Sequence, residues 1–262
     1  MHLTQPKYYA VIPTAGVGSR MSLTLPKQYA LIDGFPLITY TLSTFLANAS
    51  FDKISVVISA NDPYWEKLSF QGNNQRNRLI SCEGGSSRAE SVLEGLKALE
   101  PYANQHDRVF VHDAARCGLT DNLLIRLSES LDNQIDAMGA ILAIPVFDSL
   151  KKVNQAGIIT ASEDRRLYWQ AQTPQCFPYG ALKNALADVL AATNRSDSDR
   201  ITDESSAMEL KGVFAEVVLS SNENMKVTCD EDLELMQIII EKQIARGDRC
   251  SPATFFKKTE CW

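Results

Sequence analysis

Short apolar runs alternate with longer amphipathic stretches along most of this chain, and this alternation constrains the fold more than any other feature. The runs at 8–12, 54–59, 108–112 and 140–145 have the length and the β-branched content of buried strands. The stretches between such runs have the length and periodicity of helices. Because strands that alternate with helices favour a parallel sheet, we expect an α/β fold with a doubly wound, mostly parallel sheet.

The remaining elements follow from the same pattern and from local capping signals. Further strands are predicted at 79–81, 167–172, 214–219 and 225–227. Two capping boxes, Ser87–Glu90 and Thr228–Glu231, mark helix starts. The complete set of predicted helices is 37–48, a short one opened by Asp62-Pro63, 87–99, one capped by Asp121, 179–192, 202–210 and 228–245.

The alternation of strands and helices breaks between Val146 and about Arg166. Two alternating segments flank the turn Asn154–Gly157, which predicts a β-hairpin. A lone hairpin is marginally stable in water, so this arm (146–166) is expected to pack on a second subunit or on the parent domain. We expect residues 1–245 to form one domain and 246–262 to be a C-terminal tail that is free to fray.

A strand, a loop of small residues and two cations open the chain. The first run gives way to Pro13-Thr14-Ala15-Gly16-Val17-Gly18, and Arg20 and Lys27 follow. Small residues let backbone N–H groups approach a phosphate, and cations neutralise its oxygens. The segment therefore predicts a site for a polyanion, with a solvated charged loop as the alternative.

The two best-known phosphate loops do not match this segment. A Walker loop requires a closing Lys-Ser/Thr pair, which the segment does not supply. The dinucleotide fingerprint requires a small residue where Met21 stands, and a helix that begins at once where Pro26 interrupts the chain. A nicotinamide-dependent enzyme is therefore an unfavourable interpretation.

Other polar residues follow predicted strands at the same edge of the sheet. Gly85 follows the third strand, Asp113 and Arg116 follow the fourth, and Lys226 lies on a short late strand. Thr202 begins a predicted helix. Its hydroxyl and the nearby backbone N–H groups could hold a phosphate. Asp113 and Thr202 also have a structural interpretation as helix caps, and Arg116 and Lys226 as surface charges. Because ligands of open α/β sheets bind at the carboxyl ends of strands, their shared placement favours a binding site.

Composition argues against several function classes. A net charge of −6 over 262 residues gives no electrostatic case for binding nucleic acid or an anionic membrane. The six cysteines include no C-x-x-C pair, and three histidines provide no zinc motif. The start of the chain has no charged-then-apolar leader, and the longest apolar run, 137–146, is too short to span a bilayer. We expect a cytoplasmic protein.

The sequence shows no familiar set of nucleophilic residues. No Ser-His-Asp or Cys-His set stands in a recognisable frame, and His112 lies inside an apolar run, where a buried structural histidine is the expected interpretation. A reaction without a protein nucleophile fits better. Transfer to an acceptor phosphate needs positioning and charge neutralisation but no base, because the acceptor is already ionised.

Several motifs, in order, resemble one known family. The opening at 13–28 is similar to nucleotidyltransferases of the nucleotide-sugar pyrophosphorylase type. The motifs that narrow the resemblance are Val111–Arg116, Asp148–Lys151, Trp169–Gln175, Thr202–Glu204 and Met225–Thr228. Together they resemble the methylerythritol phosphate cytidylyltransferases of the non-mevalonate isoprenoid pathway, over residues 8–240.

The resemblance implies a CTP-dependent enzyme that joins a cytidyl group to a sugar-alcohol phosphate and releases pyrophosphate. It also implies Mg²⁺ on the triphosphate and a homodimer made by interlocked arms. Arg20 and Lys27 would stabilise charge that develops at the α-phosphate and the leaving pyrophosphate. Arg165 and Lys226 would position the acceptor phosphate, with Arg165 supplied by the partner's arm in one version. The substrate-binding residues would be Thr14, Ala15, Gly16, Gly85, Ser91, Asp113, Arg116 and Thr202.

Within that set, Ala15, Gly16, Gly85 and Ser91 would line a cytosine pocket. Asp113 and Arg116 would face the acceptor or the ribose, and Thr202 would assist at the acceptor phosphate.

Three positions depart from the family pattern, and two alternatives stay open. Thr14 replaces a frequent Ala, Ser86 replaces an Asp of some members, and Cys117 replaces the usual Pro. Ser86 leaves part of the nucleotide contact undefined, and Cys117 could loosen the loop after Arg116. The alternatives are a ribitol phosphate cytidylyltransferase and a non-catalytic nucleotide-binding module. The wording of the 113–116 motif favours the erythritol enzyme, and the acceptor-side cations disfavour a module.

Overall fold

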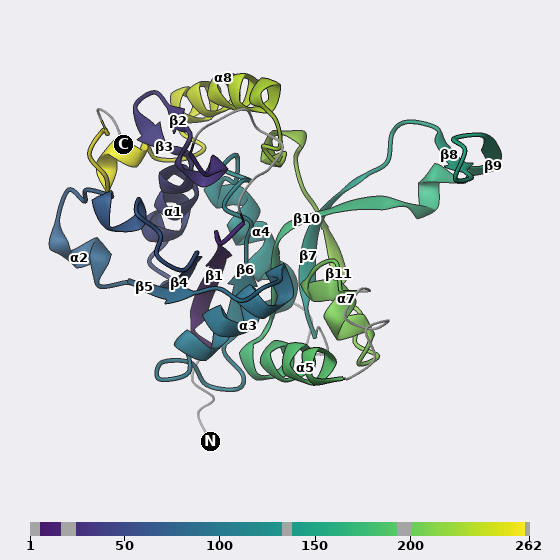
Figure 1. Ribbon diagram of the computed structural model, residues 1–262, viewed down its shortest axis with the longest axis horizontal. Coiled ribbons are helices and arrows are strands. Elements are labelled where there is room, and N and C mark those ends of the chain that lie inside the picture. Colours follow the sequence, from purple (N-terminus) through teal and green to yellow (C-terminus); the bar gives the residue numbers. More distant parts are fainter. Residues whose placement is uncertain (1–5, 17–24, 133–137, 193–200, 260–262) are drawn as a thin grey trace.

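The computed structural model describes residues 6–16, 25–132, 138–192 and 201–259 (Figure 1). Its centre is a seven-stranded sheet in the order β11-β7-β10-β6-β1-β4-β5. The strands are β1 (Tyr8–Pro13), β4 (Phe51–Ile58), β5 (Leu79–Glu83), β6 (Arg108–Val111), β7 (Ala140–Pro145), β10 (Trp169–Pro178) and β11 (Glu216–Leu219). All neighbours pair in parallel except β10, which is antiparallel to both β6 and β7. The prediction of a mostly parallel α/β sheet is confirmed.

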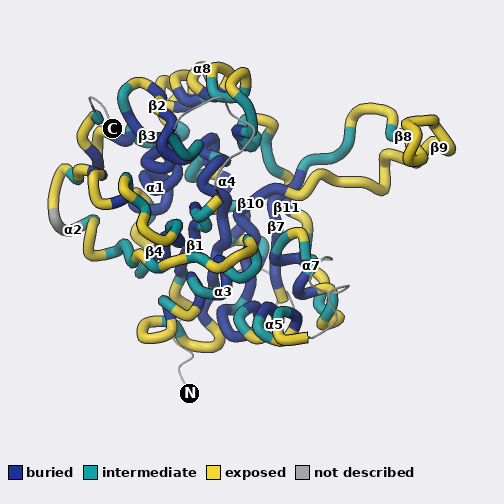
Figure 2. The backbone as a smooth tube through the Cα atoms, in the orientation of Figure 1, coloured by how far each residue is buried: buried dark blue, intermediate teal, exposed yellow. Residues whose placement is uncertain are grey.

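Helices cover both faces of the sheet because side chains of each strand alternate between them. Ala10 and Ile12 of β1 pack in one core with α1 (Leu37–Ala47), α4 (Asp121–Asp132) and α8 (Asp230–Arg246). Tyr9 and Val11 pack in a second core with α3 (Arg88–Ala98), α5 (Tyr179–Ala191) and α7 (Glu204–Glu209). Figure 2 shows the buried strands between these two helix layers. The fold is therefore doubly wound, as predicted.

Short elements connect these layers. They are η1 (Lys27–Tyr29), β2 (Leu31–Ile32), β3 (Phe35–Pro36), η2 (Trp65–Lys67), α2 (Asn73–Arg76), η3 (Arg165–Leu167), η4 (Asn222–Asn224) and η5 (Pro252–Thr254). The helix expected after Asp62-Pro63 is only the single turn η2. The Asp62 carboxylate accepts the N–H groups of Tyr64 and Trp65, which holds this turn in place.

The hairpin arm is present and stands apart from the main sheet. Strands β8 (Leu150–Val153) and β9 (Ile159–Glu163) form their own two-stranded antiparallel sheet, which projects far from the body (Figure 1). Gly157 closes the turn with φ of +77°, a conformation that glycine adopts without steric cost. The arm is exposed along nearly its whole length (Figure 2), so within one chain it does not pack on the parent domain.

Two predictions of local structure are wrong near the end of the chain. The segment 225–227 is not a strand, because it forms no ladder; the Val227 N–H donates to the Ala115 carbonyl at 2.8 Å, and the Val227 carbonyl accepts from Lys27 Nζ at 3.2 Å. The last capping box is shifted by one residue, since Cys229 is the N-cap of α8 and Asp232 is the residue that reaches back. The Asp232 carboxylate accepts both the N–H and the hydroxyl of Thr228, which makes Thr228 look like a cap in the sequence.

The described part of the segment after α8 is packed and is not a free tail. Arg249 is 4% exposed and donates to the carbonyl oxygens of Cys117 and Tyr40. Phe256 is 1% exposed, and its ring centroid lies 4.9 Å from that of Phe70. The reason is that these side chains complete the core beside α1, which local sequence patterns do not reveal.

Candidate active site

A pocket of about 350 Å³ opens where β1, β5 and β6 end. This is the edge at which the sequence predicted a site, because parallel strands present their carboxyl ends together. The lining residues are Pro13, Thr14, Ala15, Gly16, Lys27, Gln28, Gly85, Ser86, Ser87, Arg88, Ser91, Asp113, Ala114, Ala115 and Lys226.

The described part of the first loop is fixed by hydrogen bonds to neighbouring strands. The N–H and the hydroxyl of Thr14 both donate to the Val57 carbonyl, at 2.7 Å each. Gln28 Nε2 donates to the Thr14 carbonyl at 2.7 Å, and Ser59 donates to the Ala15 carbonyl at 3.0 Å. The Thr14 hydroxyl therefore strengthens the attachment of this loop to β4.

The second glycine loop packs closely against the first. A Cβ on Gly84 would stand 2.8 Å from the Ala15 Cβ and 2.7 Å from the Ser91 hydroxyl, so no side chain fits there. Ser87 then caps α3 by accepting the Glu90 N–H at 3.1 Å. The Glu90 carboxylate reaches back to the N–H and the hydroxyl of Ser86, at 2.6 Å each. The loop that carries Ser86 in place of Asp is thus held by Glu90.

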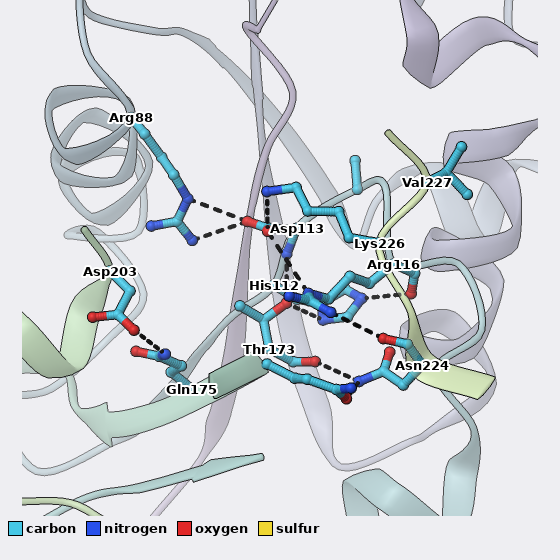
Figure 3. Close-up of polar contacts among 12 residues, drawn as sticks. Arg88, His112, Asp113, Arg116, Thr173, Gln175, Asp203, Asn224, Lys226 and Val227 are labelled. Atoms are coloured by element: carbon cyan, nitrogen blue, oxygen red, sulfur yellow. Dashed lines mark hydrogen bonds and ion pairs between the residues drawn. The ribbon is translucent and has the colours of Figure 1, made fainter. Parts of the chain in front are cut away.

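One carboxylate, that of Asp113, gathers three cations at the other end of the pocket (Figure 3). Its Oδ1 accepts from Arg88 Nε and Nη2 at 3.2 and 3.0 Å, and its Oδ2 accepts from Lys226 Nζ at 2.7 Å. Arg116 lies at 3.9 Å from Oδ2 and donates instead to the Asn224 carbonyl at 3.1 Å. The result is a cluster with more positive than negative charge around one fixed carboxylate.

The ionisation of this cluster follows from its surroundings. Burial would raise the pKa of Asp113, but Arg88, Lys226 and Arg116 outweigh it and hold that pKa well below its usual value. Burial lowers the pKa of Arg88, but Glu204 and Asp113 reverse this and raise it overall. Burial raises the pKa of Glu204, and pairing with Arg88 opposes that rise. The cluster is therefore built to keep Asp113 and Arg88 charged.

Lys27 borders the same pocket from the opposite chain segment. Its ammonium donates to the carbonyl of Val227 at 3.2 Å. Val227 is the residue that follows Lys226 in the chain. Two lysines far apart in the sequence thus meet at one cavity. Positive charges on both sides of a small-residue pocket suit a ligand with several phosphates.

His112 is structural, as expected from its apolar surroundings. It is fully buried, with Nδ1 3.0 Å from the Thr173 hydroxyl and Nε2 3.1 Å from the Arg116 carbonyl. The same hydroxyl accepts the Asp113 N–H at 3.0 Å. A neutral ring protonated on Nε2 satisfies all these groups, and burial lowers the pKa of His112 to about 3. His112 holds the loop that carries Asp113 and offers no proton to the pocket.

Most of the predicted site residues meet at this pocket. The structure places Thr14, Ala15, Gly16, Lys27, Gly85, Ser91, Asp113 and Lys226 on its wall. Arg20 lies outside the described residues.

Three predicted residues are not part of the pocket wall of the same chain. Arg116 stands behind Asp113, where it holds the Asn224 carbonyl. Thr202 is exposed, one residue before Asp203, which is the true cap of α7. Arg165 is on the exposed arm and donates to the Phe147 carbonyl.

Arg88 lines the pocket but was not predicted as a site residue, because in the sequence it stands inside the capping box Ser87–Glu90. A cation in the first turn of a helix faces the positive end of the helix dipole, which is unfavourable without a nearby anion. Arg88 is the first residue of α3, and its anions are Asp113 and Glu204. That position was the one signal in the sequence.

Within the ranges that the structure describes, no group of three His, Cys, Asp or Glu residues could hold a metal ion. Among the described residues that line the pocket, the carboxylate is that of Asp113, and it already pairs with Arg88 and Lys226. Among the described helices, none is long and apolar enough to cross a membrane.

Comparison with known proteins gives one consistent result. The family model for 2-C-methyl-D-erythritol 4-phosphate cytidylyltransferase matches residues 8–242. A protein of that name from Pseudomonas fluorescens (strain SBW25) is 42% identical over 234 residues, which cover 89% of this chain and 95% of the relative. The one from Dechloromonas aromatica is 38% identical over 235 residues, which cover 90% of this chain and 98% of the relative.

Solved structures agree with the sequence comparison. The crystal structure of the Francisella tularensis 2-C-methyl-D-erythritol 4-phosphate cytidylyltransferase superposes with a TM-score of 0.75 at 31% identity, over 89% of this chain and 99% of the other. A 4-diphosphocytidyl-2C-methyl-D-erythritol synthase superposes with a TM-score of 0.73 at 34% identity, over 90% and 99%. With its fold, its pocket and its sequence all in agreement, this chain belongs to the 2-C-methyl-D-erythritol 4-phosphate cytidylyltransferase family.

Proposed function

We propose that this protein transfers the cytidylyl group of CTP to 2-C-methyl-D-erythritol 4-phosphate, in the synthesis of isoprenoid precursors. The products are 4-diphosphocytidyl-2-C-methyl-D-erythritol and pyrophosphate. The observation that carries the proposal is one pocket that joins two loops of small residues to the cations Lys27, Arg88 and Lys226. The relatives in its family are named for this reaction.

The reaction joins two anions. An oxygen of the acceptor phosphate attacks the α-phosphorus of CTP, and a new P–O bond forms. The bond from that phosphorus to the oxygen bridging to the β-phosphate breaks, and pyrophosphate leaves with the bonding electrons. The attacking oxygen is already ionised, so no side chain has to remove a proton. A pocket whose nearby histidine is buried and neutral suits such a reaction.

The charges on the pocket wall divide between the two substrates. In this proposal Ala15, Gly16, Gly85 and Ser91 receive the cytosine, because small residues leave room for a flat base against the backbone. Lys27, together with Arg20, neutralises charge that grows at the α-phosphate and on the leaving pyrophosphate. Lys226 receives the acceptor phosphate, and Asp113 fixes the position of its ammonium.

The acceptor side is completed, in this proposal, by Arg165 from a second subunit. Arg165 lies on the projecting arm and is not among the described residues that line the pocket of its own chain. The arm also exposes large apolar side chains: Phe147, Val153, Ile158, Ile159 and Leu167 are 53–79% exposed. Such a concentration of exposed apolar surface is typical of a contact with another chain. A homodimer with exchanged arms covers this surface and brings Arg165 to the partner's pocket.

Mg²⁺ is proposed to accompany CTP. Magnesium is commonly held by substrate phosphates with only one or two protein carboxylates. Because Asp113 is already held by cations, the residues in the described ranges do not form a metal cage of their own. The ion would therefore arrive on the triphosphate, where it neutralises phosphate charge.

We also propose that the enzyme works in the cytoplasm. No disulfide links the cysteines within the described ranges, as is usual in a reducing compartment.

A substrate matrix tests the function. The purified protein is incubated with each of the four nucleoside triphosphates and with either 2-C-methyl-D-erythritol 4-phosphate or ribitol 5-phosphate, and pyrophosphate is measured. We expect release only with CTP and the erythritol phosphate. Release with ribitol 5-phosphate would assign the protein to the sister reaction. Binding of CTP without pyrophosphate release in any combination would support a nucleotide-binding module.

A further inference from the structure

A buried carboxylate that does not line the pocket is connected to one that does. Glu204, the first residue of α7, is 1% exposed, and its two oxygens accept from Arg88 Nη1 and Nη2 at 2.7 and 3.2 Å. Arg88 also donates to Asp113, which in turn holds Lys226 (Figure 3). A chain of alternating charges thus runs from the buried start of α7 to the ammonium of Lys226.

We propose that Glu204 is a positioning residue for the acceptor substrate. By holding Arg88, it determines how the Asp113 carboxylate is shared, and so where the Lys226 ammonium stands. The inference rests on the proposed role of Lys226 in receiving the acceptor phosphate.

The sharing of Asp113 is resolved oxygen by oxygen. Arg88 occupies Oδ1 with Nε and Nη2, and Lys226 occupies Oδ2 at 2.7 Å. A guanidinium normally binds both oxygens of a carboxylate through two parallel hydrogen bonds. Here Glu204 engages the edge of Arg88 formed by Nη1 and Nη2, and both donors of the remaining edge, Nε and Nη2, point to Asp113 Oδ1. Oδ2 is thereby left for Lys226.

Glu204 is not required to hold α7 in place. Asp203 caps this helix by accepting the Ser206 N–H at 2.9 Å, and Gln175 of β10 binds both Asp203 and the Ser205 N–H, at 2.8 Å each. Burial of an ion pair adds little stability, because removing two charges from water offsets their attraction. An apolar pair would serve packing at least as well, which favours a functional reason for these charges.

Replacing Glu204 by glutamine tests the idea with almost no change in shape. The amide directs an NH₂ donor toward a guanidinium that has only donors, so Arg88 loses part of its anchor. Arg88 is then free to take both oxygens of Asp113 and to compete with Lys226. A small misplacement of a substrate-holding group costs about a hundredfold in rate. We expect Glu204→Gln to lower kcat/KM for the acceptor by about this factor, with KM for CTP changed less than about twofold.

Glu209→Gln is the matched control, because Glu209 lies exposed on the same helix and accepts only from Ser205 among the recorded contacts. A double-mutant cycle with Arg88→Gln supplies a readout that a purely structural role would not move. If Glu204 acts through Arg88, the double variant has the same acceptor kcat/KM as Arg88→Gln alone. Independent, multiplying losses, or equal changes in the KM values of both substrates, would overturn the proposal.

A second pair of substitutions keeps the test decisive if Glu204→Gln does not fold. Arg88→Leu/Glu204→Leu removes both charges together and leaves neither unpaired. We expect this variant to melt at or above the wild-type temperature and to lose acceptor-dependent turnover selectively. A folded double variant with normal acceptor kinetics would refute the positioning role. If the wild-type protein releases no pyrophosphate, the proposed function fails. If the wild-type protein is active and the variants have the same kinetics, only this inference fails.

Discussion

Lys226 Nζ lies 2.7 Å from Asp113 Oδ2, although 113 residues separate them in the chain. The side chain of Asp113 is 12% exposed and that of Lys226 is 40% exposed, so a buried carboxylate holds a cation that still reaches solvent. This arrangement fixes the ammonium without neutralising the pocket, because Arg88 and Arg116 contribute further positive charge. We therefore expect the acceptor phosphate to bind at this end of the pocket.

Lys226→Ala is expected to impair use of the acceptor much more than use of CTP. Loss of one charged hydrogen bond corresponds to about 2–3 kcal/mol, or roughly a hundredfold in kcat/KM for the acceptor. Steady-state kinetics with each substrate varied in turn measures the split. Lys211→Ala is the control, because Lys211 forms only an exposed ion pair with Asp188 among the recorded contacts. Equal rises in KM for both substrates would contradict a specific acceptor role.

Lys27→Ala and Arg20→Ala are each expected to reduce turnover rather than CTP affinity. In the proposed mechanism each substitution removes a cation that offsets charge growing in the transition state, an effect of about 3 kcal/mol or roughly a hundredfold in kcat. The control is Lys242→Ala on the exposed side of α8. A variant with normal kcat and only a raised KM for CTP would show that its cation serves ground-state binding.

Mixed subunits test whether Arg165 acts across a dimer. Arg165→Ala and Lys226→Ala are each expected to be strongly impaired alone, whereas a mixture that exchanges subunits should recover activity. In the heterodimer, one pocket receives Arg165 and Lys226 from different chains, both intact, and the other pocket lacks both. Subunit exchange is verified separately with differently tagged chains. No recovery despite confirmed exchange would place Arg165 and Lys226 in one subunit's site and leave the arm a structural role.

His112 is expected to make the protein less stable in mild acid. Its pKa is about 3 when folded and about 6.5 when unfolded, so between these values only the unfolded chain binds the proton. The free energy of unfolding should therefore fall by about 1.4 kcal/mol for each pH unit lost between pH 6 and 4. When the free energy of unfolding is measured with urea at several pH values, its dependence on pH should be shallower in His112→Gln by about this amount. The exposed His106→Gln should keep the wild-type slope, and an unchanged slope in His112→Gln would exclude His112 as its source.

Phe256→Ala tests whether the segment after α8 belongs to the folded core. Truncating a phenyl ring that is 1% exposed leaves a cavity, and we expect a loss of about 3–4 kcal/mol in the free energy of unfolding. Phe214→Ala removes a ring that is 75% exposed and should change stability very little. Denaturant unfolding compares the two. Equal, small effects would mean that the end of the chain is only loosely attached.

Features that depend on neighbouring residues could be predicted from the amino-acid sequence. Strand and helix periods, the turn at Asn154–Gly157 and the small-residue loops follow from local backbone preferences. Within the described residues the structure confirms them, except for the strand expected at 225–227 and the helix expected after Asp62-Pro63, which is a single turn. The placement of Asp113 beside the loop 14–16 at one pocket was also predictable, because β1 and β6 are parallel and end at the same edge of the sheet. His112 was interpreted correctly because an apolar run buries whatever polar residue it contains.

Which charged side chains form ion pairs depends on the tertiary structure. Arg88 is 25 residues from Asp113 and 116 residues from Glu204, and no local pattern encodes that contact. The antiparallel insertion of β10, the packing of Phe256 and the absence of Arg165 from the described wall of its own pocket likewise depend on how distant segments fit together. The physical reason is that backbone periodicity is set by residues within a few positions, whereas ion pairing and core packing depend on proximity in space.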